Sequence, residues 1–118
     1  MAYLLLIVED PAQRATRTEA EGRAVYERMQ AFAAQLQREG KLLAVESLAS
    51  QRRATRVSAG GAQILDGPFA EAKEMVGGFF MLDCATQHEA VAIARRCPAA
   101  EWATVEVRAT SPCYDDSL

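Results

Sequence analysis

The sequence contains a single histidine, His88, and three cysteines, Cys84, Cys97 and Cys113, among its 118 residues. The cysteine count is odd and no two cysteines form a C-x-x-C pair, which argues against a disulfide framework and against a zinc site. Free thiols suit a reducing compartment. We therefore expect a cytoplasmic protein that holds no metal and no other cofactor.

Long apolar runs and an excess of basic charge are also missing. The longest apolar stretch covers residues 2–8, well short of the roughly 20 residues that cross a membrane. It lacks the basic start and the small-residue cleavage site of a signal peptide. Lys and Arg number 13 against 16 Asp and Glu, a net charge of -3, whereas nucleic-acid binders carry a basic stripe. The sequence predicts neither a membrane nor a nucleic-acid partner.

Apolar residues make up 50% of the chain, which is enough for the core of one domain. We expect that domain over residues 1–110 and a polar tail over 111–118. The expected strands are 2–8, 41–48, 53–58, 62–65, 76–83 and 103–108, and the expected helices run from Thr18 to Glu39 and from Thr86 to Arg96. Residues 10–18 are polar and are expected to form a loop.

The ends of the helices carry their own signals. Thr18 and Thr86 are each followed three residues later by a glutamate, the spacing of a capping box. Gly40 stands where a left-handed residue would end the first helix. The order of strand, helix, several strands, helix and strand predicts an α+β ferredoxin-like sandwich, βαββ(β)αβ, with one antiparallel sheet and two helices on one face.

Large apolar side chains alternate to both faces of two expected strands. Tyr3, Leu5 and Ile7 face one side and Leu4, Leu6 and Val8 the other, while Phe79 and Met81 oppose Phe80 and Leu82. Leaving four or five of them exposed would forgo roughly 6–15 kcal/mol, which rivals the stability of a whole domain. We therefore expect a homodimer in which the second sheet face packs on a second copy, with a cavity between the sheets.

The last expected strand places charge on one of these faces. Val105 and Val107 share one side, and Glu106 and Arg108 share the other. If the valines meet the helices, the charged pair points into the open face, where it is costly unless it is paired or wet. The pair then lies either at an edge or interface rim, or in a polar wall of the cavity between subunits.

Residues 66–78, DGPFAEAKEMVGG, hold the densest group of candidate catalytic side chains: Asp66, Glu71, Lys73 and Glu74. The glycine and proline after Asp66 stiffen this loop. A carboxylate beside a lysine is held ionised, and one in an apolar pocket has a raised pKa, so the group has the ingredients for proton transfer. The alternatives are a solvated turn, or an Asx-turn in which Asp66 accepts backbone N–H bonds.

The stretch DGPFAEAKEMVGGFFML resembles the signature of the YCII-related family, in the bacterial branch named for its DGPF motif. The opening AYLLLIVED, the Arg96-Cys97-Pro98 turn and the closing residues 105–108 resemble it in the same order. The resemblance implies a ferredoxin-like α+β fold of the dimeric α+β barrel type, in the group that includes muconolactone isomerases. Other branches have a proposed His and Asp catalytic pair. This chain has only His88, expected to be exposed near a helix start, so that mechanism does not carry over.

Two functions remain open, and with them the question of whether the protein is an enzyme. In the first, a small polar or carboxylated molecule binds between the sheets of the homodimer and undergoes isomerase-like or lyase-like proton transfer. Tyr3, Phe69 and Phe79 would form its apolar walls, Lys73 or Arg108 would pair with an anionic group, Glu106 would lie in the polar wall, and Asp66, Glu71 or Glu74 would move the proton.

The second function is that of a non-catalytic binding or regulatory module. The DGPF loop would then be a structural latch that fixes the dimer or presents a surface to a protein partner. The sequence shows no nucleophile–His–acid set, no phosphate loop and no dinucleotide fingerprint, which favours this alternative. The resemblance adds that members of this branch often occur beside extracytoplasmic-function sigma factors.

Overall fold

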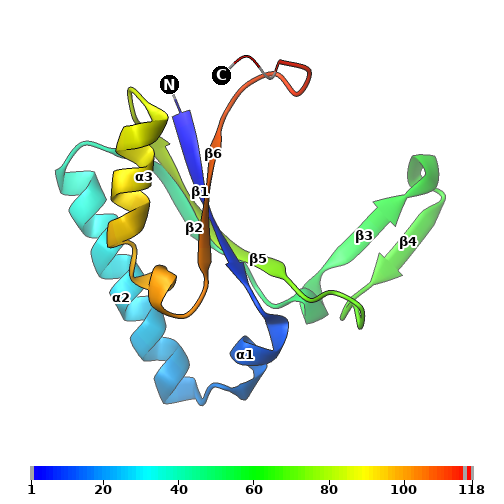
Figure 1. The fold of residues 1–118 in the computed structure, drawn as a ribbon. Helices are drawn as coiled ribbons and strands as arrows, with labels where there is room; N and C mark the ends of the chain where they lie inside the picture. Colours follow the sequence, from blue (N-terminus) through cyan, green and yellow to red (C-terminus); the bar gives the residue numbers. More distant parts are fainter. Residues whose placement is uncertain (1, 116, 118) are drawn as a thin grey trace.

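The computed structural model describes residues 2–115 and 117 and consists of two layers with a projecting hairpin (Figure 1). A four-stranded antiparallel sheet in the order β2-β5-β1-β6 forms one layer, and helices cover one of its faces. The elements are β1 (Ala2–Glu9), α1 (Pro11–Thr16), α2 (Glu19–Arg38), β2 (Leu42–Ser47), η1 (Gln51–Arg53), β3 (Thr55–Ser58), η2 (Ala59–Gly61), β4 (Gln63–Asp66), β5 (Met75–Asp83), α3 (Gln87–Arg96), η3 (Pro98–Glu101) and β6 (Thr104–Ala109). This mixed α+β architecture is compatible with the expected ferredoxin-like sandwich. Residues 1, 116 and 118 of the expected domain and tail lie outside the described residues.

The sheet carries apolar side chains on both faces, as the alternation predicts. Along β1, Leu5 is fully buried against the helices, whereas Leu6 on the other face is only half-buried. Leu6 pairs with Phe79 of β5 on one side and with Glu106 of β6 on the other. We call the face without helices the open face.

The core lies between the helices and the sheet. Its buried side chains are Tyr3, Leu5, Ile7, Phe32, Leu36, Phe80, Leu82, Cys84, Ala90, Ile93, Ala94, Cys97 and Ala99. The rings of Phe32 and Phe80 meet edge to face with centroids 5.4 Å apart. Val105 and Val107 pack against this core, which leaves the charged residues of β6 on the open face.

Helix α2 begins and ends where its caps predict. The Thr18 hydroxyl accepts the Glu21 N–H at 3.1 Å, and the Glu21 carboxylate accepts the Thr18 N–H at 2.8 Å. That backbone N–H holds the pKa of Glu21 below its ordinary value. At the other end Gly40 has φ +72°, and the Lys41 N–H reaches back to the Leu36 carbonyl at 2.9 Å. Among the helices of the described ranges, none is long and apolar enough to cross a membrane.

The loop expected at residues 10–18 is wrong in part, because residues 11–16 form the short helix α1. The Asp10 side chain caps it by accepting the Ala12 N–H at 2.9 Å, and Pro11 occupies the first turn. An Asp followed by Pro is a helix start signal. The helix has no buried residue, so hydrophobic periodicity could not have predicted it.

The strands expected at 53–58 and 62–65 form over shorter or shifted ranges, as β3 and β4, because Arg53 belongs to η1, and they leave the main sheet. β3 and β4 pair with each other in a sheet of their own and turn at Gly60 and Gly61, both with positive φ. Residues 55–66, which we call the arm, project away from the body on the side opposite the helices (Figure 1). The arm is therefore an appendage of the sandwich.

Two glycines at α2 should respond in opposite directions to alanine. Gly40→Ala places a side chain at φ +72° and should lower the free energy of unfolding by about 1–2 kcal/mol. Gly22→Ala lies within the helix with no atom near the new Cβ, so it should raise that free energy by up to about 1 kcal/mol. Urea unfolding measures both, and equal effects at the two positions would contradict the assigned helix end.

Candidate functional site

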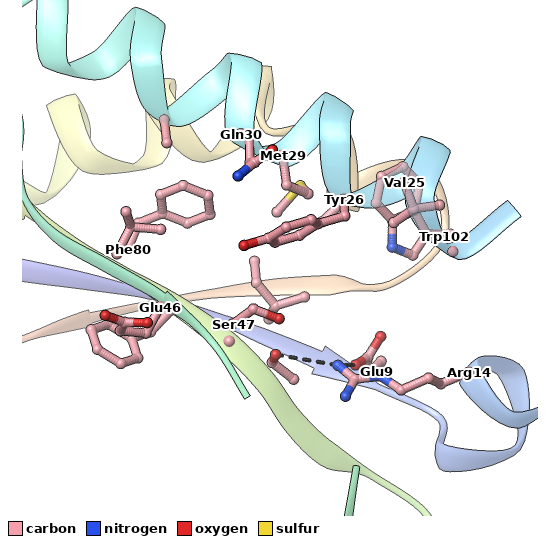
Figure 2. Close-up of a pocket in the computed structure, with 18 of the residues that line it drawn as sticks. Glu9, Arg14, Val25, Tyr26, Met29, Gln30, Glu46, Ser47, Phe80 and Trp102 are labelled. Atoms are coloured by element: carbon pink, nitrogen blue, oxygen red, sulfur yellow. Dashed lines mark hydrogen bonds and ion pairs between the residues drawn. The ribbon is translucent and has the colours of Figure 1, made fainter. Parts of the chain in front are cut away.

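A cavity of about 770 Å³ lies between α2 and the helix-covered face of the sheet (Figure 2). Val25 and Met29 enter it from α2, Phe80 from β5, and Trp102 from the turn before β6. These side chains give the cavity apolar walls along its length. A cavity of this size matches the roughly 300–1,000 Å³ of small-molecule sites.

Small residues on both layers create the space. Gly22, Ala33 and Ala34 line the cavity from α2, and Gly77 and Gly78 line it from β5. A protein interior is normally packed without voids larger than a water molecule. Here the helix and the strand lack the side chains that would close the gap between them.

One end of the cavity contains an ion pair between the buried Glu9 and the partly exposed Arg14 (Figure 2). Glu9 is the last residue of β1 and is only 4% exposed. Arg14 lies on α1 and also donates to the carbonyls of Leu48, at 2.7 Å, and Gly77, at 3.2 Å. The guanidinium therefore joins α1 to β1, to β5 and to the segment after β2.

Neither glycine of β5 could carry a side chain, and a different neighbour prevents it at each position. A Cβ on Gly77 would lie 2.6 Å from the Glu9 carboxyl carbon and 2.7 Å from Arg14 Nη2. A Cβ on Gly78 would lie 2.8 Å from the Glu46 carbonyl oxygen. Gly77 thus leaves room for the ion pair, and Gly78 allows β2 to approach.

A second, more polar cavity of about 480 Å³ lies beside the first. Glu9 and Trp102 line both cavities. Lys73 and Glu74, two of the catalytic candidates of the sequence, are exposed and line this second cavity. They are the charged candidates of this segment that line a cavity together with Glu9.

The open face brings together three other candidates. Phe79 lies between Leu6 and Glu46 in the strand register, and Glu106 is the neighbour of Leu6 on the other side. Arg108 donates to Glu106 at 3.3 Å, and both side chains are exposed. This charged pair lies along the β6 edge of the open face.

The DGPF residues lie at the base of the arm, where they make structural contacts. Asp66 accepts a hydrogen bond from the Thr55 hydroxyl across the hairpin at 2.9 Å. The Gly67 N–H donates to the Ala54 carbonyl at 2.8 Å, and a Cβ at position 67 would overlap the Gln51 carbonyl. Glycine is therefore required where the arm meets η1.

Phe69 is also used at the arm base. It is 9% exposed, and the Arg56 guanidinium lies 3.8 Å from its ring centroid. Tyr3 is buried in the core on the helix-covered face, so it does not share a face with Phe79. Glu71 is exposed in the segment between the arm and β5.

The remaining reactive residue types do not gather at the cavities. Burial raises the pKa of the Cys84 and Cys97 thiols, which disfavours the nucleophilic thiolate. His88 is exposed at the second position of α3, as expected. Across residues 2–115 and 117, no group of three or more His, Cys, Asp or Glu side chains could hold a metal ion.

Glu9 and Arg14 are the site residues that the sequence reasoning did not select. A usable signal existed for Glu9, since it continues the series Tyr3, Leu5 and Ile7 that faces the helices. No comparable signal existed for Arg14, whose partners lie as far as 63 residues away along the chain.

Comparison with known proteins gives two similarities. The YCII-related domain profile matches residues 1–113. The chain is also 35% identical over 97 residues to the uncharacterized protein R00369 of Rhizobium meliloti (strain 1021). That alignment covers 80% of this chain and 78% of the relative.

Removing the cation from the buried pair should be costly. Arg14→Met leaves the Glu9 carboxylate without its partner and should lower the free energy of unfolding by about 2–4 kcal/mol. The double variant Glu9→Gln/Arg14→Met removes both charges and should recover at least half of that loss. Urea unfolding of the wild type, both single variants and the double variant gives the coupling energy. If Arg14→Met leaves the free energy of unfolding unchanged, the ion pair does not stabilise the fold.

Proposed function

The chain belongs to the YCII-related domain family, and on this basis we propose that it binds a small organic molecule in the α2 cavity and transfers a proton on it. The observation that carries the proposal is the buried Glu9 carboxylate at one end of a cavity of about 770 Å³ with apolar walls. Small-molecule sites commonly combine apolar walls with a few fixed polar groups. A carboxylate in such surroundings is a suitable general base.

Arg14 acts in this proposal as a positioning residue. Its guanidinium is fixed by the Leu48 and Gly77 carbonyls and by Glu9 Oε1. We therefore assign Glu9 Oε2 to the ligand. A held carboxylate loses little conformational freedom when a ligand binds, and the adjacent positive charge stabilises negative charge that develops on the ligand.

The reaction type that suits one carboxylate is an isomerase-like proton shift. Glu9 Oε2 takes a proton from the carbon between a ligand carbonyl and a C=C bond, and the C–H electron pair forms a dienolate. The resulting carboxylic acid returns the proton to the far carbon of the former C=C bond, and the double bond moves next to the carbonyl. Atoms and charge balance without any co-reactant, and Glu9 ends as it began.

The walls indicate the shape of the ligand. Val25, Met29 and Phe80 favour an apolar body, while Tyr26 and Gln30 on α2 place polar atoms along the cavity (Figure 2). A compound with a hydrocarbon part and a carbonyl head group fits this distribution. The head group would lie toward Glu9, because there the cavity is charged.

We also propose that two copies pack through their open faces, as a dimeric α+β barrel of the DGPF branch in the cytoplasm. Half-buried Leu4, Leu6, Phe79 and Met81 support this packing, since a single chain leaves them partly in water. The Glu106–Arg108 pair would then lie at the rim of the interface. The three free cysteines are compatible with a reducing compartment.

A second candidate function is the non-catalytic binding or regulatory module. It is favoured by the structural use of the DGPF segment, in which Asp66, Gly67 and Phe69 anchor the arm. In that case the Glu9–Arg14 pair only joins the elements around it. Ligand binding and isotope exchange separate the two functions.

Ligand binding is tested by blocking the cavity. Gly22→Trp adds a large side chain to a cavity-lining position with open space above it, and Gly22→Ala is the matched control. In a thermal-shift screen of small keto acids, lactones and hydroxy acids, compounds that stabilise the wild type should lose their shift with Trp and keep it with Ala. A shift that survives Gly22→Trp would place binding elsewhere.

Proton transfer is tested by isotope exchange, which needs no knowledge of the product. Compounds that bind are incubated with the protein in deuterium oxide, and mass spectrometry follows deuterium entering carbon positions. Glu9→Gln should slow this exchange at least about 100-fold, whereas Glu27→Gln, an exposed residue of α2, should not change it. Equal exchange with Glu9→Gln would remove Glu9 as the base. Binding without exchange for every compound would favour the non-catalytic module.

A further inference from the structure

The arm is the feature of the molecule that the cavity does not explain. It projects on the side of the sheet opposite the helices (Figure 1), and it contributes to the shape of the whole chain. The radius of gyration is 15.7 Å, whereas a compact domain of this length has about 13.5 Å. Apolar side chains on such an extension stay in water unless a partner covers them.

The two faces of the arm differ. On one face the cross-strand pair Val57 and Ile64 is 64% and 69% exposed. On the other face Arg56 is stacked on Phe69, its cross-strand partner Leu65 is 58% exposed, and the polar pair Ser58 and Gln63 lies nearer the turn. The first face therefore carries an apolar cross-strand pair, whereas the second carries one exposed leucine beside charged and polar side chains.

The base of the arm is closed by ordered contacts. The Gly67 N–H bonds to the Ala54 carbonyl, and the Asp66 carboxylate bonds to Thr55. Phe69 is buried under Arg56. A two-stranded hairpin alone is only marginally stable in water. These contacts keep the hairpin folded while its apolar pair stays exposed. An element that docks on a partner requires both properties.

We infer that the Val57–Ile64 face of the arm packs against a second copy of this chain, so that each protomer of a two-fold dimer is gripped by the arm of the other. This inference rests on the proposed dimer and is independent of the Glu9 cavity. It gives the DGPF motif a defined role, which is to close the base of the arm so that the hairpin stays folded.

Three observations favour a second copy as the occupant. The open face, through which the two copies are proposed to pack, lies on the side toward which the arm projects, so the second copy lies where the arm extends. The arm base is basic through the exposed Arg52 and Arg53, while Glu46 and Glu106 place carboxylates toward the two edges of the open face. In a two-fold dimer each arm meets the other copy in the same way, so both arms are covered.

The test measures dimer dissociation of the full chain by sedimentation equilibrium. Val57→Glu/Ile64→Glu places charge on the apolar face of the arm, and Ser58→Glu/Gln63→Glu places the same charge on its other face. The first variant should raise the dimer Kd at least about 100-fold, and the second should leave it within about threefold of the wild type. Far-UV circular dichroism confirms that each variant is folded, and Val57→Ser/Ile64→Ser replaces the first variant if it is not.

A third variant separates the arm from the open face. Phe79→Glu charges the centre of the open face without touching the arm. If Phe79→Glu dissociates the dimer while Val57→Glu/Ile64→Glu does not, the arm inference is overturned and the proposed dimer stands. If the wild type is monomeric at micromolar concentration, the arm inference and the proposed dimer are both overturned. The same holds if the arm of such a monomer binds phospholipid vesicles or another protein. The thermal shifts of cavity ligands should persist in the arm variant, because the cavity lies within one chain.

Discussion

The sheet has apolar side chains on both faces, and the helices cover only one of them. Every strand residue that packs inward has neighbours along the chain that point outward, because successive side chains alternate. Leu5 can be fully buried only if Leu4 and Leu6 lie on the opposite face. This constraint gives the molecule an inner side on which a cavity can form and an outer side that one chain leaves partly in water.

The helix-covered side holds a candidate site because a cavity and a buried charged residue occur at the same place. Small residues of α2 and β5 leave the space unfilled, and the strand series that fills the core with Tyr3, Leu5 and Ile7 continues to Glu9. A buried carboxylate is costly unless it is paired. Arg14 meets that requirement only because α1 turns back after β1, and Gly77 leaves the room in which the two side chains meet.

Much of this arrangement can be predicted from the sequence, and the features that cannot be predicted share a physical cause. The caps at Thr18 and Gly40 act through neighbours in the chain, so local spacing is enough to predict them. Arg14 acts through Leu48 and Gly77, which are distant in sequence, and no local pattern records such a meeting. The charged segment after Asp66 suggested chemistry by its density alone. The structure uses its glycine and phenylalanine to anchor the arm, while its carboxylates are exposed.

The cavity and the open face lie on opposite sides of the same two strands, which limits how they can influence each other. β5 gives Gly77 and Phe80 to the cavity and Phe79, which also borders the cavity, to the open face, while β1 gives Glu9 to the first and Leu6 to the second. A ligand that binds equally well to one copy and to a pair has no effect on assembly, however tight its binding. Coupling between the two sides would therefore require a shift of β1 or β5 themselves. The close fit of Gly77 against Glu9 leaves little room for such a shift, so ligand binding and assembly should act as separate equilibria.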